Sequence, residues 1–370
     1  MAIIGIVGLG TMGLGIAQVF AAAGNDVVAT DGHAPARENA KARMELTLNK
    51  RLSAGKLTSD AVQATVSHFT VSEGLSGLQE CDLVIEAIAE NLVAKQTLFK
   101  NLEAILPKTA VLATNTSALS ITAMAQALAR PERLLGLHFF NPAPAMKLVE
   151  LVTRPTNAAD AIALARKLTE AARKTVVECA DRPGFIVNRC ARPFYGEALA
   201  MLEEGRRAED IDAAMLASGY RLGPFALIDL IGADINLAAT KSLNAGMSGH
   251  PRYFVFQSLI DQVAAGHLGA KTGQGFVTGA KTNPQPNDAI TRRLEAVLAN
   301  EAATLLDEGG QTPASIDLAM KLALNYPRGP FESARRWGLP AIRNELAHLA
   351  ATAPAHLKTR YDISPSLAEM

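Results

Sequence analysis

The sequence predicts a doubly wound, parallel α/β sheet followed by an all-α region that is present as two tandem copies. Short apolar runs alternate with helix-like segments in the first half of the chain. Long Ala- and Leu-rich segments without strand-like runs fill the second half, and a pattern of residues recurs within them. We therefore expect a sheet domain over residues 1–181 and two helical domains over residues 182–279 and 288–370, the second of them truncated.

The chain opens with a strand–turn–helix–strand pattern. An apolar run leads into three glycines with the spacing GxGxxG, and a helix-like segment follows. Gly8 permits a tight turn, Gly10 lets a pyrophosphate approach the backbone, and Gly13 lets the helix pack closely on the strand. The unpaired amides at the helix start suit phosphate groups. The pattern predicts a Rossmann-type dinucleotide site, whose expected contacts in this turn are Gly8, Gly10, Thr11, Met12 and Gly13.

An acidic residue ends the second apolar run. Asp31 stands where a carboxylate can accept hydrogen bonds from the adenine ribose hydroxyls. The same charge would repel a 2′-phosphate, so the sequence favours NAD over NADP as the cofactor.

Composition narrows the class of protein. The chain has 370 residues and balances 36 basic against 36 acidic side chains, which suits a globular enzyme and argues against a general nucleic-acid binder. Glycines interrupt the apolar N-terminal segment, which lacks a basic start, and no later run is long enough for a membrane span. We expect a cytoplasmic protein without a membrane or nucleic-acid partner. Cys81, Cys179 and Cys190 lack metal-type spacing, so we expect small buried hydrophobes and no metal site.

The alternation of strands and helices continues after Asp31. A helical arm is expected over residues 34–57, and strands are expected over residues 82–87, 111–115, 134–140 and 148–152. Strands separated by helices predict a parallel sheet. Ligands then gather at the carboxyl ends of the strands, where Asp31, Glu90 and Ser117 fall.

The helical half contains an internal repeat. Residues 197–205 (EALAMLEEG) correspond to residues 301–309 (EAATLLDEG), and Gly223-Pro224-Phe225 corresponds to Gly329-Pro330-Phe331. The polar segment 279–287, which contains Pro284 and Pro286, separates the copies. The unit is too long for a solenoid repeat, so we interpret it as a duplicated helical domain.

Two residues near the end of the first half predict acid–base chemistry. A proline-containing loop between two strands can bring His138 and Glu150 together. A carboxylate beside one imidazole nitrogen fixes the tautomer and stabilises the cation that forms when the other nitrogen accepts a proton. Such a pair suits removal of an alcohol proton during hydride transfer to NAD. The alternative is a core histidine that is hydrogen-bonded to the backbone.

Seven blocks along residues 1–278 resemble the NAD-dependent L-3-hydroxyacyl-CoA dehydrogenases. They are GLGTMG, IEAIAENLVAK, TNTSALSI, GLHFFNPAPAMKLVELV, DRPGFIVNRC, GYRLGPFALIDLIG and KTGQGF. The helical duplication resembles the longer bacterial members, including those that act on 3-hydroxyadipyl-CoA. The resemblance implies NAD as cofactor, a CoA-thioester substrate and reversible oxidation of a 3-hydroxyacyl chain to the 3-oxoacyl form.

The resemblance also implies roles for individual residues. His138 would be the general base and Glu150 its partner, while Ser117 and Asn188 would bind the region of the substrate's 3-oxygen. Asn141 would help to polarise the thioester side. Glu90 and Lys95 would contact the ribose and nicotinamide end of NAD. The expected cofactor contacts outside the glycine turn are Asp31, Glu90, Lys95, Asn115, Ser117 and Asn141.

Structural alternatives stand beside these roles. Ser117 could cap a helix that begins near Leu119, Glu90 and Lys95 could form a solvated helical pair, and Asn188 could bridge domains. Arg192, Arg206 and Arg207 could pair with a distal carboxylate of the substrate, although a solvated surface position is the favoured interpretation.

Two other functions stay open at this point. One is a dehydrogenase of a free hydroxy acid, and the other is a non-catalytic NAD-binding protein. For the assembly, the duplication predicts either a pseudo-dimeric monomer, in which the second copy covers the surface that pairs subunits in shorter relatives, or a homodimer.

Overall fold

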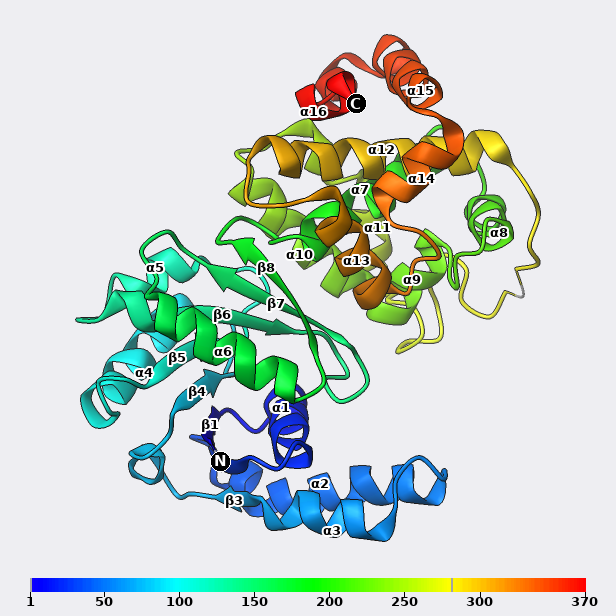
Figure 1. Cartoon of the computed structure of the whole chain (residues 1–370). Coiled ribbons are helices and arrows are strands. Elements are labelled where there is room, and N and C mark those ends of the chain that lie inside the picture. Colours follow the sequence, from blue (N-terminus) through cyan, green and yellow to red (C-terminus); the bar gives the residue numbers. More distant parts are fainter. Residues whose placement is uncertain (1, 281) are drawn as a thin grey trace. The chain divides into compact units, whose positions relative to one another are not determined.

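The computed structural model describes residues 2–280 and 282–370. The chain divides into two compact units, Met1–Arg182 and Pro183–Met370 (Figure 1). The first unit contains the strands, and the second is helical over its described residues.

The first unit is built on an eight-stranded sheet with the order β3-β2-β1-β4-β5-β6-β7-β8. Its strands are β1 (Ile3–Val7), β2 (Asp26–Thr30), β3 (Phe69–Val71), β4 (Leu83–Glu86), β5 (Val111–Thr114), β6 (Leu134–Phe139), β7 (Leu148–Thr153) and β8 (Thr175–Ala180). Six of the neighbouring pairs are parallel, which confirms the doubly wound sheet.

One pair of strands departs from the predicted parallel arrangement. Strands β6 and β7 are antiparallel. The loop between them contains no crossover helix, and a parallel connection needs a dozen or more residues, usually with a helix. A short connection therefore returns the chain in the opposite direction.

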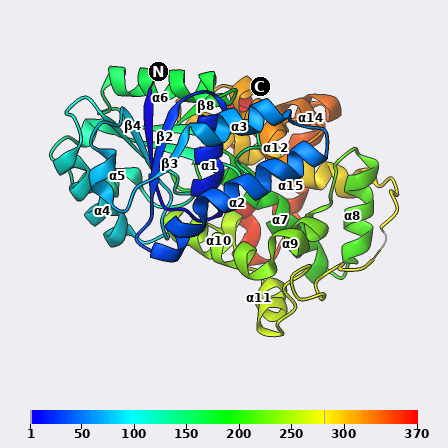
Figure 2. The same ribbon diagram turned by 90° about the horizontal axis from the view of Figure 1, so that it is seen from below.

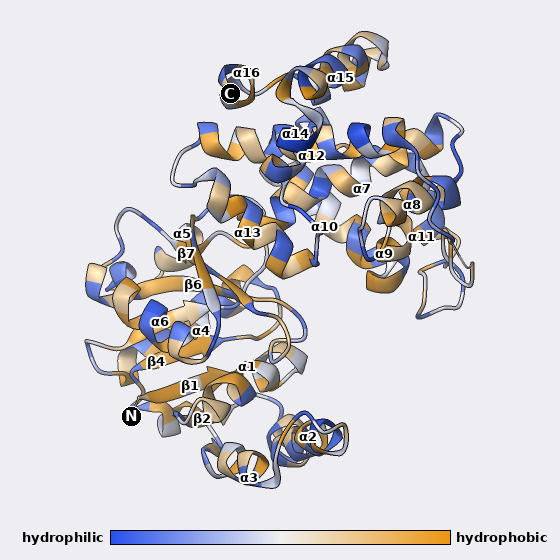
Figure 3. Ribbon diagram, turned by 45° about the vertical axis from the view of Figure 1, so that its right-hand side comes forward, coloured by the Kyte–Doolittle hydropathy of each residue, from blue (hydrophilic) through white to orange (hydrophobic). Residues whose placement is uncertain are grey.

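Helices pack around this sheet. They are α1 (Thr11–Ala22), α2 (Ala34–Ser53), α3 (Ser59–Ser67), α4 (Leu92–Ile105), α5 (Ile121–Ala125) and α6 (Ala159–Ala171). Helix α2 ends earlier than the expected arm and lies beside α3, as Figures 1 and 2 both show. Apolar strand residues such as Ile4, Ile6 and Ile85 are fully buried in the core, and strand β1 is drawn as hydrophobic in Figure 3.

The second unit contains the two helical copies. The first copy has α7 (Val187–Glu203), α8 (Ala208–Ala217), α9 (Pro224–Ile231), α10 (Ala233–Gly246), η3 (Pro251–Tyr253) and α11 (Gln257–Ala264). The second has α12 (Asp288–Asp307), α13 (Pro313–Leu324), α14 (Pro330–Trp337), α15 (Leu339–Thr352), η4 (Ala355–Tyr361) and α16 (Pro365–Glu369). None of the helices over the described residues is long and apolar enough to cross a membrane.

The repeat extends to single hydrogen bonds. Asp212 accepts hydrogen bonds from the amides of Phe225 and Ala226 at the start of α9. Asp317 accepts the equivalent bonds from Phe331 and Glu332 at the start of α14. A Cβ atom on Gly223 or Gly329 would collide with these carboxylates, which explains why both copies carry glycine there. Lys281, within the predicted linker, lies outside the described residues.

Candidate active site

The register of β6 and β7 brings His138 and Glu150 together. The two residues are direct partners in the antiparallel pair, so their side chains project from the same face of the sheet. His138 Nδ1 lies 2.6 Å from Glu150 Oε2. His138 is 6% exposed and Glu150 is fully buried. The predicted pair is therefore present, and the antiparallel turn of the chain creates it.

This hydrogen bond determines what the imidazole can do. A neutral ring that donates its Nδ1–H to the carboxylate carries its basic lone pair on Nε2. Protonation at Nε2 would create a cation beside the buried Glu150 carboxylate, which stabilises that cation. The pair has the geometry of a general base with an orienting acid, and the ring of Phe140 lies 4.5 Å from the imidazole, centroid to centroid.

A second buried carboxylate, which the sequence analysis did not single out, lies at the end of β4. Glu86 is fully buried and accepts hydrogen bonds from Lys95 Nζ at 2.6 Å, Thr114 Oγ1 at 2.7 Å and the Ile88 amide at 2.7 Å. The sequence did contain a signal for this residue, because Glu86 is an acid at the end of an otherwise apolar strand. Glu86 ties β4, β5 and α4 together at the carboxyl ends of the strands.

Glu90 belongs to the same network. Its Oε2 lies 3.2 Å from Lys95 Nζ, while its Oε1 accepts hydrogen bonds from Thr116 Oγ1 at 2.5 Å and the Ser117 amide at 3.2 Å. Lys95 is 1% exposed, so the alternative interpretation of Glu90 and Lys95 as a solvated helical pair is wrong. The lysine lies between two carboxylates and positions Glu90 against the turn that carries Ser117.

The turn after β5 holds the predicted Asn115 and Ser117. Asn115 Oδ1 accepts a hydrogen bond from the Phe139 amide at 2.8 Å, beside His138 in sequence. Ser117 is exposed. Its alternative role as a helix cap is wrong, because α5 begins at Ile121 and the Ser120 side chain provides the cap. Glu90, Asn115 and Ser117 thus lie together at one edge of the sheet.

The glycine turn has the predicted geometry. Gly8 has a φ of +103°, and a Cβ at Gly13 would lie 1.8 Å from the Gly8 carbonyl oxygen, so both positions require glycine. A Cβ at Gly10 would meet nothing within 4 Å among the described residues. The protein itself therefore gives no steric reason for Gly10, whereas a pyrophosphate at the start of α1 does. This open position fits a dinucleotide.

Asp31 joins this turn to the end of β2. Its carboxylate accepts hydrogen bonds from the Leu9 amide at 2.7 Å and the His33 amide at 2.8 Å. Arg37 donates to the Asp31 carbonyl at 2.6 Å, and Arg43 donates to the Leu9 carbonyl at 2.8 Å. Each carboxylate oxygen has lone pairs beyond the one that these amides use, as the predicted ribose contact requires.

The remaining predicted residues lie elsewhere. Asn141 is exposed and directly follows β6 and Phe140. Asn188 is half-buried in the first turn of α7, and so belongs to the second unit. Arg206 and Arg207 are exposed, as the favoured interpretation requires. For Arg192 that interpretation is wrong, because its side chain is packed between α7 and α10 and is 7% exposed.

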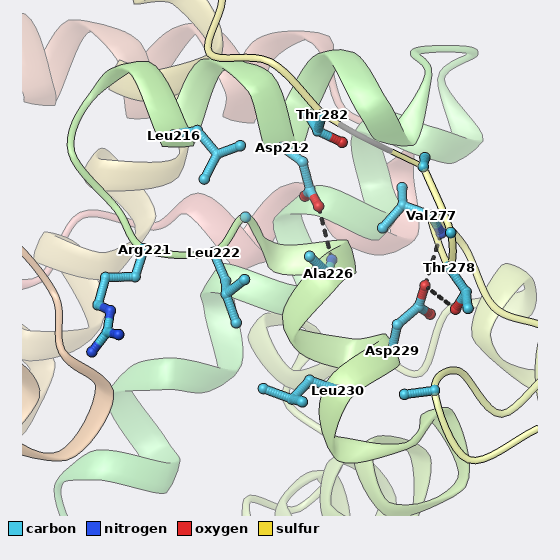
Figure 4. Close-up of a pocket in the computed structure, with 14 residues that line it drawn as sticks. Asp212, Leu216, Arg221, Leu222, Ala226, Asp229, Leu230, Val277, Thr278 and Thr282 are labelled. Atoms are coloured by element: carbon cyan, nitrogen blue, oxygen red, sulfur yellow. Dashed lines mark hydrogen bonds between the residues drawn. The ribbon is translucent and has the colours of Figure 1, made fainter. Parts of the chain in front are cut away.

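The helical unit also has a cavity of about 460 Å³ beside α8 and α9, shown in Figure 4. Asp212 and Asp229 line it, but both carboxylates already accept hydrogen bonds from the protein. Asp229 accepts them from the Phe276 and Val277 amides and from Thr278 Oγ1. These acids hold a loop and a helix start in place, so we assign them a structural role. Cys81, Cys179 and Cys190 are buried, as expected.

The sheet, the glycine turn and the buried His–Glu pair together define a dinucleotide-dependent dehydrogenase. Two family models match the chain. The NAD-binding domain of 3-hydroxyacyl-CoA dehydrogenase matches residues 3–182, and the C-terminal domain of the same family matches residues 184–279 and again 290–370. The chain belongs to the 3-hydroxyacyl-CoA dehydrogenase family, and its first unit is an NAD-binding domain.

Relatives of known name agree with this family. A 3-hydroxyadipyl-CoA dehydrogenase of Escherichia coli K12 is 43% identical over 276 residues, which cover 74% of this chain and 58% of that protein. A probable 3-hydroxybutyryl-CoA dehydrogenase of Bacillus subtilis is 40% identical over 277 residues, covering 73% of this chain and 95% of that protein. The crystal structure of a 3-hydroxybutyryl-CoA dehydrogenase from E. coli K12 superposes with a TM-score of 0.92 at 31% identity, covering 100% of this chain and 98% of that one.

Proposed function

We propose that the protein catalyses the reversible, NAD-dependent oxidation of an L-3-hydroxyacyl-CoA to the 3-oxoacyl-CoA, with His138 as general base and Glu150 as its partner. The observation that carries this proposal is the 2.6 Å contact between His138 Nδ1 and Glu150 Oε2 at the end of β6. Family membership supports the substrate class.

The residues divide the work of the reaction. Bound NAD would accept the hydride from the 3-carbon of the substrate. His138 Nε2 would accept the hydroxyl proton as the C–O bond becomes a carbonyl, and Glu150 would stabilise the resulting imidazolium. In the reverse direction, the same imidazolium would return the proton to the oxygen.

Other residues would hold the reactants. Gly8, Gly10, Thr11, Met12 and Gly13 would bind the pyrophosphate, and Asp31 would bind the adenine ribose. Glu90 would contact the nicotinamide ribose. Lys95, which was expected to contact the same end of NAD directly, would instead support Glu90 from its buried position. Ser117 and Asn188 would bind the 3-oxygen region and Asn141 the thioester side, with Asn115 fixing the end of β6. These roles, the domain boundaries and a cytoplasmic location stay predictions.

Substitution of the proposed base tests the function. We expect His138→Ala to lower kcat for oxidation of 3-hydroxybutyryl-CoA by about 10²–10⁴-fold, the usual contribution of general-base catalysis, while NAD binding survives. Glu150→Gln keeps the shape of the acid but removes its charge, and should also lower kcat.

A surface pair supplies the matched control. His68 Nδ1 lies 2.8 Å from Asp26 Oδ1, with side-chain exposures of 28% and 57%. His68→Ala should leave kcat near the wild-type value. Near-normal turnover by His138→Ala would remove the catalytic assignment. Turnover of a free hydroxy acid but not its CoA ester would favour the first alternative function, and no turnover of any acyl-CoA would favour a non-catalytic NAD-binding role.

A further inference from the structure

Arg192 is a buried cation in the second unit. It lies on α7 and is 7% exposed. Its Nη1 donates to Thr240 Oγ1 on α10 at 3.2 Å, and its guanidinium carbon lies 5.2 Å from the centroid of the Tyr195 ring. Its Nε is buried and has no hydrogen-bond partner among the described residues. The protein therefore satisfies only part of this guanidinium.

No carboxylate of the described residues forms an ion pair with Arg192. Burial lowers the pKa of its guanidinium, and the groups that oppose this effect are the phenols of Tyr195 and Tyr326, which burial keeps protonated and uncharged near neutral pH. The other deeply buried arginines of this unit differ: Arg189 and Arg252 pair with Glu301, and Arg360 pairs with Glu197. A guanidinium stays charged in proteins, and an unpaired buried charge is costly. An anion that binds here would complete its pairing.

The position of Arg192 along α7 indicates which anion. Asn188 lies four residues earlier, so both side chains project from the same face of the helix, about 6 Å apart along its axis. Side chains on a helix lean toward its N-terminus, so the long Arg192 side chain inclines toward the turn that carries Asn188. In the proposed function, Asn188 binds the region of the substrate's 3-oxygen.

We propose that Arg192 binds a second carboxylate at the far end of the acyl chain, which makes a 3-hydroxy-dicarboxylyl-CoA the preferred substrate class. This inference rests on the proposed function, because that function assigns Asn188. A carboxylate three carbon–carbon bonds beyond the 3-carbon lies about 4 Å from it when extended. The spacing of about 6 Å along α7, shortened by the inclination of the Arg192 side chain toward Asn188, can accommodate this distance. The phosphates of CoA lie many bonds away, beyond the thioester and the pantetheine arm. Tyr326, whose buried hydroxyl lacks a partner among the described residues, can donate to the same carboxylate.

A matched pair of substrates tests this without a mutation. 3-Oxoadipyl-CoA and 3-oxohexanoyl-CoA have the same chain length, but the first ends in a carboxylate and the second in a methyl group. In an NADH oxidation assay of the whole chain, we expect kcat/KM to favour 3-oxoadipyl-CoA by at least about 30-fold, the effect of one hydrogen-bonded, buried charge pair. Equal values, or a preference for 3-oxohexanoyl-CoA, would overturn the proposal.

Substitutions locate the preference in one side chain. Arg192→Met keeps an unbranched apolar stem without the charge, and should lower the ratio of the two kcat/KM values to near one. Arg192→Lys retains a cation and should restore part of the ratio. Arg206→Met, at an exposed arginine of the same unit, should leave the ratio unchanged.

The possible results distinguish a failure of this inference from a failure of the proposed function. If Arg192→Met lowers kcat/KM for both esters by the same factor, Arg192 is only structural and the inference is wrong, although the dehydrogenase function stands. If the wild-type chain reduces neither of these esters nor acetoacetyl-CoA, the proposed function fails and the inference fails with it.

Discussion

Arg189 of the first helical copy pairs with Glu301 of the second, with Nε 2.6 Å from Oε1 and both side chains buried. The equivalent residues form the reciprocal pair, because Arg293 of the second copy lies 2.7 Å from Glu197 of the first. Arg252 and Tyr253 complete the site around Glu301, as Arg360 and Tyr361 do around Glu197. Every contact from the first copy to the second thus has an equivalent contact from the second copy to the first, as in an isologous two-fold interface. The two copies therefore pack against each other as two subunits of a dimer would.

Removal of one central acid should destabilise this arrangement. Glu301→Gln removes the counter-charge that Arg189 and Arg252 share and leaves Arg189 paired with Glu308 alone, so we expect it to lower the free energy of unfolding by about 3 kcal/mol. Urea denaturation followed by circular dichroism measures the change. Glu209→Gln removes one partner of the exposed pair with Arg207 and should cost less than about 1 kcal/mol. Equal effects of the two substitutions would contradict the role assigned to Glu301.

The internal pairing of the copies also predicts the assembly. Because the reciprocal charge sites are filled within one chain, we expect a pseudo-dimeric monomer with the mass of a single chain, 39.0 kDa. Multi-angle light scattering of the purified protein measures this mass. A homodimer in which the first copies of two chains pair with each other would show that the second copy does not cover that surface.

Local pattern predicted most of the fold. The glycine turn, the strands at 82–87 and 111–115 and the helical repeat all have signals confined to a few neighbouring residues, and the structure contains each of them. Strands β3 and β8 were missed. Strand β3 has only three residues, and the apolar residues of the edge strand β8 are interrupted by Glu178, so neither forms a long apolar run.

The site was predictable where one segment carried it. The segment from His138 to Glu150 returns on itself, so the sequence alone could place the two residues together. The roles of Glu86 and Arg192 were harder to predict, because they depend on residues from other segments of the chain. The role of Glu86 depends on its hydrogen bonds from Lys95 and Thr114. The role proposed for Arg192 depends on the lack of an acidic partner among the described residues around it. Such long-range pairings follow from packing and have no local signature.

The choice of nicotinamide cofactor should depend on the charge of Asp31. Asp31→Asn removes the carboxylate that repels a 2′-phosphate, while the cations Arg37 and Arg43 stay bound to nearby carbonyls. We expect kcat/KM for NADH to fall by at least about 10-fold and the preference for NADH over NADPH to shrink by a larger factor. Steady-state assays with both cofactors measure the two ratios. Asp26→Asn, at the exposed start of the strand that Asp31 follows, should change neither ratio. An unaltered preference in Asp31→Asn would contradict the proposed ribose contact.

The stability of the helical unit should depend on pH through Asp212. Burial raises the pKa of this carboxyl to about 7, although the amides of Phe225 and Ala226 donate hydrogen bonds that favour its charged form. In the unfolded chain an aspartate loses its proton near pH 4. Between these two pH values the folded protein binds more protons than the unfolded chain, so the free energy of unfolding contributed by Asp212 falls as the pH rises. The asparagine in Asp212→Asn does not titrate, so this variant does not lose that free energy of unfolding as the pH rises.

Thermal unfolding at two pH values measures the effect. We expect the Tm of Asp212→Asn, relative to the wild-type Tm, to be more favourable at pH 8 than at pH 5, whatever the substitution costs at either pH. Asp160→Asn is the control, because a hydrogen bond from Arg133 lowers the pKa of Asp160 below its ordinary value. The stabilisation from Asp160 is present above that ordinary value and is lost only as the pH falls below it, so its Tm difference should be the same at pH 5 and pH 8. A Tm difference for Asp212→Asn that is equally independent of pH would show that the folded protein holds Asp212 charged at both pH values, with its two amide hydrogen bonds outweighing burial.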